Sequence, residues 1–170
     1  MDKEDPMVIS RKVYILVAVL LFLAGCAKGR LQGEQPSTLA VWDVENLSPD
    51  PAGQPDLGEI FSAKIIETIK SVGTHPVVER ERLILALEEL NLGSSELADD
   101  ATRLNVGALV GARFMVFGAY QQIGDLMRLD LRLVRVETGK IVSASQRTVT
   151  GSNLSAWIEA TEAATRELID

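Results

Sequence analysis

The chain contains few of the side chains on which enzyme sites, metal sites and disulfides depend. Its 170 residues include one cysteine, Cys26, and one histidine, His75, and aromatic residues make up 5% of the composition. A single cysteine forms no intramolecular disulfide, so packing has to stabilise the fold. His75 has no histidine or cysteine beside it, and we therefore predict a structural role for it and no metal site.

Basic residues are also in deficit. The chain has 17 lysines and arginines against 24 aspartates and glutamates, which gives a formal net charge of −7. An acidic protein is poorly suited to nucleic acid and to anionic lipid headgroups. We therefore expect protein partners and no nucleic acid.

The motifs of nucleotide binding and catalysis are missing as well. Gly107, Gly111 and Gly118 do not form a G-x-G-x-x-G pattern, and no serine has a plausible histidine base. The acidic pairs Glu88-Glu89 and Asp99-Asp100 are adjacent in sequence, and adjacent residues of a helix do not face one another. We predict no catalytic residue, no cofactor and no enzymatic activity; the glycines are expected to serve a helix end and close packing.

An apolar segment near the N-terminus is too short to cross a bilayer comfortably. It follows Arg11 and Lys12 and runs without charge from Val13 to Ala27. As a helix this run is roughly 22 Å long, whereas the hydrocarbon core is roughly 30 Å thick. The pattern is typical of a cleaved secretory signal. The alternative interpretation is a transmembrane anchor.

The end of this run resembles the lipobox of bacterial lipoproteins, with the residues Leu23, Ala24, Gly25 and Cys26. The resemblance implies a diacylglyceryl thioether on Cys26 and cleavage before it, so residues 1–25 are predicted to be a signal peptide. Ala27 follows in place of aspartate, which by the same resemblance implies the periplasmic face of the outer membrane. Residues 26–37 are rich in glycine, glutamine and serine and are predicted to be a lipidated flexible tether.

Hydrophobic periodicity predicts one α/β (α+β) domain over residues 38–170, in the order βαβααβββα. We expect about five strands in a mixed sheet, which ends in an antiparallel meander and is flanked by about four helices. The expected strands are 38–44, 75–79, 114–123, 127–136 and 140–150, and the expected helices are 56–72, 81–90, 95–109 and 153–170.

Several local features of this domain are also predicted. Asp56 and Glu59 fit a capping box, and Gly124-Asp125 fits a two-residue hairpin turn. The alternation of the second hairpin arm slips after Leu133, which predicts a β-bulge or a helix that covers this face locally. The inner faces of the two middle helices are expected to carry Leu83, Leu87 and Leu90, and Leu97, Ala101, Leu104 and Ala108.

Three segments of this domain resemble a known family. VVERERLILALEELNL, LNVGALVGARFMVFGAY and LDLRLVRVETGKIVSAS are similar, in order and spacing, to the periplasmic domain of CsgG-type curli secretion lipoproteins. They also resemble FlgO-like flagellar lipoproteins and, more distantly, LpoB-like activators of penicillin-binding proteins and the TolB N-terminal domain. The resemblance implies a sheet flanked by helices and a role in the assembly or transport of surface structures.

The chain departs from the curli channel at two connections. In that family, two long hairpins per subunit form a transmembrane barrel, and each barrel strand needs about 9–11 residues. Here only Gly124-Asp125 and Gly151-Ser152 stand at those positions. The chain is therefore interpreted as a barrel-less accessory or scaffold module, which self-associates through its soluble domain. A FlgO-like flagellar or envelope role and an LpoB-like activator role are the alternatives.

Four further residues are singled out. Glu79 and Arg80 lie in the V-V-E-R segment of the resemblance, and we expect an ion pair that stabilises a strand-to-helix junction, or alternatively a contact with a subunit or partner. Trp42 and Trp157 are expected in or near the core, with an interface anchor as the alternative.

The lipobox generates the first testable prediction. In Cys26→Ser the thioether cannot form, so the product should keep its signal segment and carry no acyl chains. Intact-mass analysis should show that this product begins at Met7, because Asp2, Glu4 and Asp5 fit a basic signal region badly. Ala27→Ser, which keeps the cysteine, is the matched control and should remain acylated. A Cys26→Ser product that retains Asp2 would contradict the start at Met7.

Overall fold

The computed structural model describes residues 37–49, 56–91 and 99–170. The signal segment, Cys26 and most of the predicted tether lie outside these residues, so their assignments stay predictions. The elements in chain order are β1 (Leu39–Val41), β2 (Glu45–Asn46), α2 (Gly58–Val72), α3 (Arg80–Leu90), α4 (Asp100–Leu109), β3 (Phe114–Ile123), β4 (Leu126–Arg135), β5 (Ile141–Thr150) and α5 (Leu154–Ile169).

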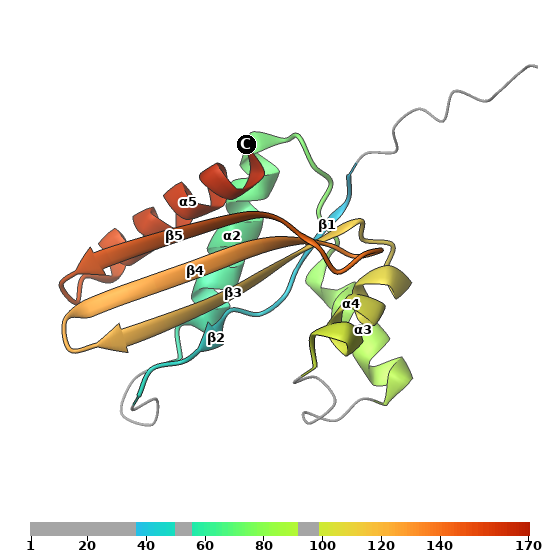
Figure 1. The fold of residues 1–170 in the computed structure, drawn as a ribbon, viewed down its shortest axis with the longest axis horizontal. Coiled ribbons are helices and arrows are strands. Elements are labelled where there is room, and N and C mark those ends of the chain that lie inside the picture. Colours follow the sequence, from blue (N-terminus) through green and yellow to red (C-terminus); the bar gives the residue numbers. More distant parts are fainter. Residues whose placement is uncertain (1–36, 50–55, 92–98) are drawn as a thin grey trace, which may run out of the picture. The chain divides into compact units, whose positions relative to one another are not determined.

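The strands form one mixed sheet, which confirms the predicted fold class. Its order is β1-β3-β4-β5, and β2 pairs with β3 beside β1. Both short strands run parallel to β3, whereas β3, β4 and β5 form the predicted antiparallel meander. Figure 1 shows α2 and α5 on one side of the meander, with α3 and α4 near one end of the strands.

The expected strand over residues 75–79 is reduced to a single bridge. Val77 pairs in parallel with Leu39, between the bonds Leu39 N–H to Pro76 O and Val78 N–H to Leu39 O, each 2.8 Å long. Pro76 has no N–H to donate, and the chain already turns into α3 at Arg80. The expected strand 38–44 is shortened to β1, and the two-residue strand β2, which begins just beyond it and was not predicted, keeps the number of strands at five.

The hairpin and the β-bulge are both confirmed. Ile123 pairs with Leu126, so Gly124 and Asp125 form a two-residue turn, and Gly124 has the positive φ of 61° that such turns favour. The β4–β5 register shifts between Leu133 and Val134. Val134 is buried in the core below α3 and α4, so a helix pair also covers this part of the sheet.

Two apolar clusters pack against the two faces of the sheet. The larger cluster lies between the sheet and helices α2 and α5, and includes Phe61, Ile65, Tyr120, Leu129 and Leu168. The smaller cluster lies below α3 and α4 and includes Val106, Val110, Met115, Phe117 and Val134. Strand β3 contributes to both clusters and is therefore the centre of the fold.

The prediction of which residues α3 and α4 bury is partly wrong. Leu90 is exposed, as are Ala101 and Ala108, and α4 instead buries Val106 and Gly107. Helix α4 approaches the sheet closely at Gly107, where a Cβ would lie 2.3 Å from Met115 Sδ. This contact decides which side of α4 is buried, and the hydrophobic periodicity of the sequence does not reveal it.

The predicted capping box of Asp56 and Glu59 is also wrong. Helix α2 begins at Gly58, and its N-cap residue Leu57 makes no side-chain cap bond. Asp56 Oδ1 accepts from Gly58 N–H at 2.9 Å, while Leu57 N–H donates to the Tyr120 hydroxyl oxygen at 3.0 Å. Burial raises the pKa of Tyr120, which therefore stays a neutral phenol at this helix end.

Gly58 generates the second prediction. In a helix, glycine to alanine is ordinarily stabilising by about 1 kcal/mol. A Cβ at Gly58, however, would lie 2.2 Å from the backbone oxygen of Val44. We therefore expect Gly58→Ala to lower the free energy of unfolding by about 1–3 kcal/mol in urea denaturation. The control Glu59→Ala, at an exposed neighbour, should change it by less than about 1 kcal/mol. A stabilised Gly58→Ala would contradict this close contact.

Candidate functional site

One half of a sheet face is left open by the helices. Pairing places Ala119, Asp130 and Gln146 side by side on the face opposite α2 and α5. Helices α3 and α4 cover this face only near Met115 and Val134. A cavity of about 760 Å³ lies over the remainder, and we call it the open-face cavity. Its lining comes from β2, β3, β4, β5 and the adjoining segments.

Two arginines on the α4 side of the cavity lie over aromatic rings. The guanidinium of Arg103 is 5.7 Å from the ring centroid of Trp42, and that of Arg132 is 5.3 Å from the centroid of Phe117. Both arginines interact with Asp100, at 3.7 and 3.0 Å. These contacts join α4 to the sheet and make one wall of the cavity.

Carboxylates hold these and neighbouring arginines in place. Arg103 also pairs with Glu45 of β2, and Arg80 pairs with Asp43. Arg128 donates two bonds of 2.8 Å to Asp130. This bidentate contact raises the pKa of Arg128 further above its usual range. The cavity is therefore bordered by preformed ion pairs.

The structure places Glu79 and Arg80 in two separate ion pairs. Lys70 of α2 lies 3.1 Å from Glu79, while Arg80 reaches Asp43 in the segment after β1. These pairs connect the start of α3 to α2 and to the sheet. Of the two residues, Arg80 pairs with a cavity-lining residue, whereas Glu79 does not. A role of either residue in partner contact stays a prediction.

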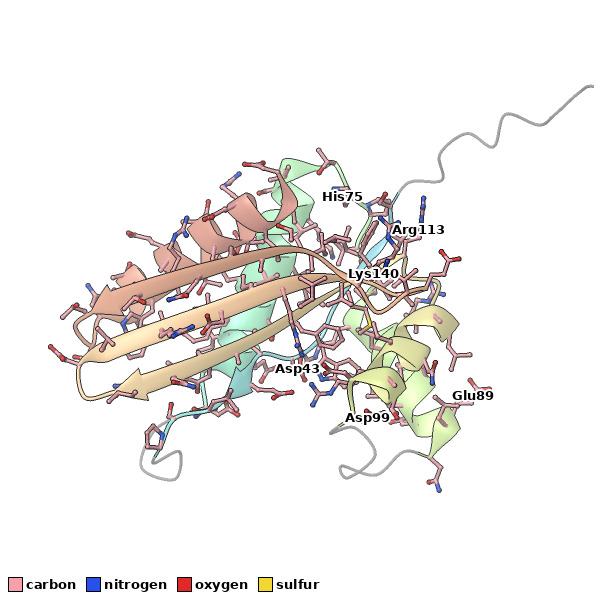
Figure 2. The ribbon with its side chains drawn as sticks, viewed as in Figure 1. Asp43, His75, Glu89, Asp99, Arg113 and Lys140 are labelled. Carbon is pink, nitrogen blue, oxygen red and sulfur yellow. The ribbon has the colours of Figure 1, made fainter. Side chains whose placement is uncertain are left out.

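The other residues weighed from sequence do not gather in one place. Figure 2 shows His75 well separated from Asp43, Asp99 and Glu89. His75 Nδ1 is buried, and within the described ranges it has no hydrogen-bond partner. Asp99 caps α4 by accepting from Thr102 N–H. In the same part of the chain, no group of three or more His, Cys, Asp or Glu residues could hold a metal ion.

The tryptophans and glycines have structural roles. Trp157 is buried and donates from Nε1 to Gly151 O at 2.8 Å, while Trp42 is half-buried at the cavity. Gly111, which follows α4, has a φ of 79°, and a Cβ at Gly118 would lie 2.8 Å from Leu131 Cδ2. The predicted uses of these glycines, a helix end and close packing, are confirmed.

Most of the cavity-lining residues carry no signal in the sequence. Arg128, Asp130 and Arg132 are recognisable as the polar side of β4 because they alternate with leucines. No sequence signal brings Asp43 or Arg103 to the same place, because they lie on other elements far along the chain.

Comparison with known proteins assigns the family. The model of the curli production assembly/transport component CsgG matches residues 37–124. The chain belongs to the CsgG family. A search of curated proteins finds no match to this CsgG-family chain. Within the described residues, none of the helices has both the length and the apolar character needed to cross a membrane.

Solved structures share the fold of this CsgG-family chain at low sequence identity. The LpoB C-terminal domain from Salmonella enterica matches with a TM-score of 0.59 and 20% identity, covering 70% of this chain and 87% of that one. A PelC dodecamer from Paraburkholderia phytofirmans gives 0.54 and 17%, covering 78% and 89%. The lipoprotein GNA1162 from Neisseria meningitidis gives 0.54 and 15%, covering 79% and 98%. At these identities the likeness concerns the fold alone.

The two stacked arginines generate the third prediction. The side chain of Arg103 is 13% exposed, whereas that of Arg132 is 42% exposed. Since cation–π and ion-pair contacts are stronger when desolvated, Arg103→Ala should cost about 2 kcal/mol of unfolding free energy. Arg132→Ala should cost less than about 1 kcal/mol. Urea denaturation of both variants measures the difference. Equal losses of unfolding free energy would show that burial of the arginine side chain does not determine its contribution to stability.

Proposed function

We propose that this CsgG-family chain is a non-enzymatic, lipid-anchored scaffold on the periplasmic face of the outer membrane, where it serves the assembly or transport of surface structures. The observation that carries the proposal is the family match over residues 37–124, whose model describes a curli assembly and transport component. The sequence contains no recognisable catalytic motif, which is consistent with a protein that functions by binding other proteins.

The membrane attachment rests on Cys26 and the residues around it. Each buried methylene of an acyl chain contributes about 0.8 kcal/mol, so two or three chains on one residue give a durable anchor. The predicted tether beyond the cysteine is about ten residues long, and spans at most roughly 35 Å when fully extended. The domain is therefore expected to work close to its own membrane.

The short connections favour an accessory role over a channel. Two residues join β3 to β4, and β5 is followed by α5 after only three residues, Gly151 to Asn153. These are the positions where the family resemblance puts the long hairpins of the curli channel. An export apparatus would then use this chain as a lipid-anchored component that does not form the channel.

Self-association is part of the proposal. PelC, which shares the fold, is described as a dodecamer. A compact lipid-anchored domain on a membrane has a high local concentration, which favours assembly of copies even when each contact is weak. The expected product is a homo-oligomer of the described domain.

Activation of a penicillin-binding protein is the second candidate. The likeness to LpoB C-terminal domains favours it as far as the fold is concerned. A tether of about ten residues speaks against it, because such an activator has to reach a synthase across the cell wall.

A FlgO-like flagellar or envelope role fits the same architecture as the first proposal.

The fourth prediction separates these functions. Envelope fractionation should place the native chain in the outer membrane and Cys26→Ser outside it. Affinity purification from detergent-solubilised envelopes should then recover components that export fibres or flagellar parts, and the purified chain alone should leave dye-loaded liposomes sealed.

Other outcomes would contradict the proposal. An unacylated cytosolic chain would remove the anchor, and dye release from liposomes would remove the accessory role. Recovery of a peptidoglycan synthase whose glycan synthesis the chain stimulates would establish the activator role instead.

A further inference from the structure

Helix α3 carries a stripe of side chains beside its buried face. The stripe follows the helical spacing of three and four residues and consists of Arg82, Leu85, Ala86 and Glu89. Residues at this spacing lie on the same side of a helix. Leu83 points to the core and is buried, whereas Leu85 is 62% exposed although it is apolar. We call the stripe the α3 face.

A groove of about 500 Å³ runs along the α3 face. All four residues of the face line it, together with Leu90 and, from the end of α4, Leu109 and Val110. Leu109 is 63% exposed and Leu90 is 42% exposed. Exposed leucines therefore gather around one small residue, Ala86. Apolar residues that are exposed together, rather than singly, are a feature of contact surfaces.

The two charged residues of the α3 face are available to another chain. Among the described residues, none forms an ion pair or a side-chain hydrogen bond with the guanidinium of Arg82 or the carboxylate of Glu89. The two residues are two helical turns apart, about 10.5 Å along the axis, and therefore cannot pair with each other. Arg80 of the same helix, in contrast, pairs with Asp43. Figure 2 shows Glu89 on the side of α3 that is turned away from the sheet.

The charges of α3 are also placed against the dipole of the helix. A helix favours basic residues in its last turn, because its carbonyl end carries partial negative charge. The last turn of α3 has no basic residue and contains Glu88 and Glu89. A neighbouring helix that runs antiparallel would bring its positive N-terminal end to this position. The charge distribution therefore favours an antiparallel helix beside α3.

The α3 face is complementary to itself in such an arrangement. Arg82 lies three residues before Leu85, and Glu89 lies three residues after Ala86. A two-fold axis between Leu85 and Ala86 therefore places Arg82 of each copy opposite Glu89 of the other. It also places the large side chain of Leu85 on the small Ala86 of the second copy. Both the charges and the shapes are matched by the same symmetry.

We propose that two copies of this chain associate through their α3 faces, with the helices antiparallel about a two-fold axis. Leu85 of each copy enters the groove of the other, between Ala86 and Leu109, and two ion pairs between Arg82 and Glu89 border the contact. The contact uses the same surface on both copies and therefore closes as a dimer. The inference rests on the proposed function, since it names a surface through which the homo-oligomer forms.

The contact is small, so membrane attachment matters to it. Two helical turns are about 11 Å long and a helix is about 10 Å wide. This is well below the roughly 800 Å² per partner that stable complexes bury. A weak dimer is therefore expected for the chain in detergent solution. Copies anchored to one membrane have a high local concentration, which populates such a dimer.

The fifth prediction exchanges the two charges of the α3 face. In Arg82→Glu and in Glu89→Arg the facing groups carry the same sign, so each single variant should raise the dissociation constant of the dimer about five-fold or more. The double variant Arg82→Glu/Glu89→Arg restores opposite charges and should dimerise as the unchanged chain does. Sedimentation of the full chain in density-matched detergent, with micelles in excess over protein, measures all four dissociation constants.

A mixture of the two single variants tests the symmetry directly. Arg82→Glu presents two carboxylates and Glu89→Arg presents two guanidinium groups, so each should pair with the other in preference to itself. Differently tagged chains should therefore purify together as a mixed dimer. Both substitutions suit the helix dipole, so loss of folding is not expected from either. Single variants that dimerise like the unchanged chain, or a double variant that stays monomeric, would overturn the proposal.

Two exposed apolar residues of α3 provide a matched pair of variants. Leu85→Glu puts a carboxylate into the groove of the second copy and should raise the dissociation constant about ten-fold or more. Ile84→Glu is the control, because Ile84 is 45% exposed on α3 but does not line the groove. It should leave the dissociation constant within about two-fold of the original value. Equal effects of the two substitutions would contradict the assigned face.

Further outcomes separate this inference from the proposed function. If the chain forms an oligomer that none of the α3 variants changes, the inference is wrong while self-association through another surface stands. If the chain stays monomeric and the α3 variants instead lose a different protein in affinity purification, that protein occupies the groove and the inference is wrong. If the dimer behaves as expected while the chain proves unacylated in cells, the inference stands and the membrane role falls.

Discussion

Strand β3 is the element on which the rest of the structure depends, because it contributes to both apolar clusters and is paired on both edges. It bonds to β1 and β2 on one side and to β4 on the other. Tyr120 enters the core below α2 and α5, whereas Met115 and Phe117 enter the core below α3 and α4. A one-residue shift of β3 would exchange these two sets of side chains. The positions of all four helices therefore follow from its register.

The open half of the sheet is a consequence of helix length and placement. Helices α3 and α4 are short and lie near the beginning of β3 (Figure 1), so the polar side chains in the first half of β4 and the second half of β5 remain accessible. Arg103 and Arg132 mark the boundary between the covered and the open part, because each lies over a ring of the sheet region and pairs with a carboxylate. The same residues thus hold α4 in place and limit the open-face cavity.

The proposed function depends on surfaces of the domain. The cavity is bordered by ion pairs that are already formed, and the groove along the α3 face is lined by exposed leucines. A CsgG-family domain with two short connections has these surfaces free for other chains. Binding through such features needs no cofactor.

The amino-acid sequence by itself determined the helices and the meander strands, the hairpin turn, the bulge after Leu133 and the family, because each depends on local periodicity, turn chemistry or short motifs. It did not determine the two short strands, since residues 75–79 form only one bridge and β2 lies beyond the expected first strand. It did not determine the buried stripe of α4 or the start of α2. These depend on Met115 beside Gly107 and on the Tyr120 hydroxyl at Leu57, contacts between residues far apart in the chain. The open-face cavity was likewise decided by tertiary structure, because strand order and helix placement select which polar residues meet.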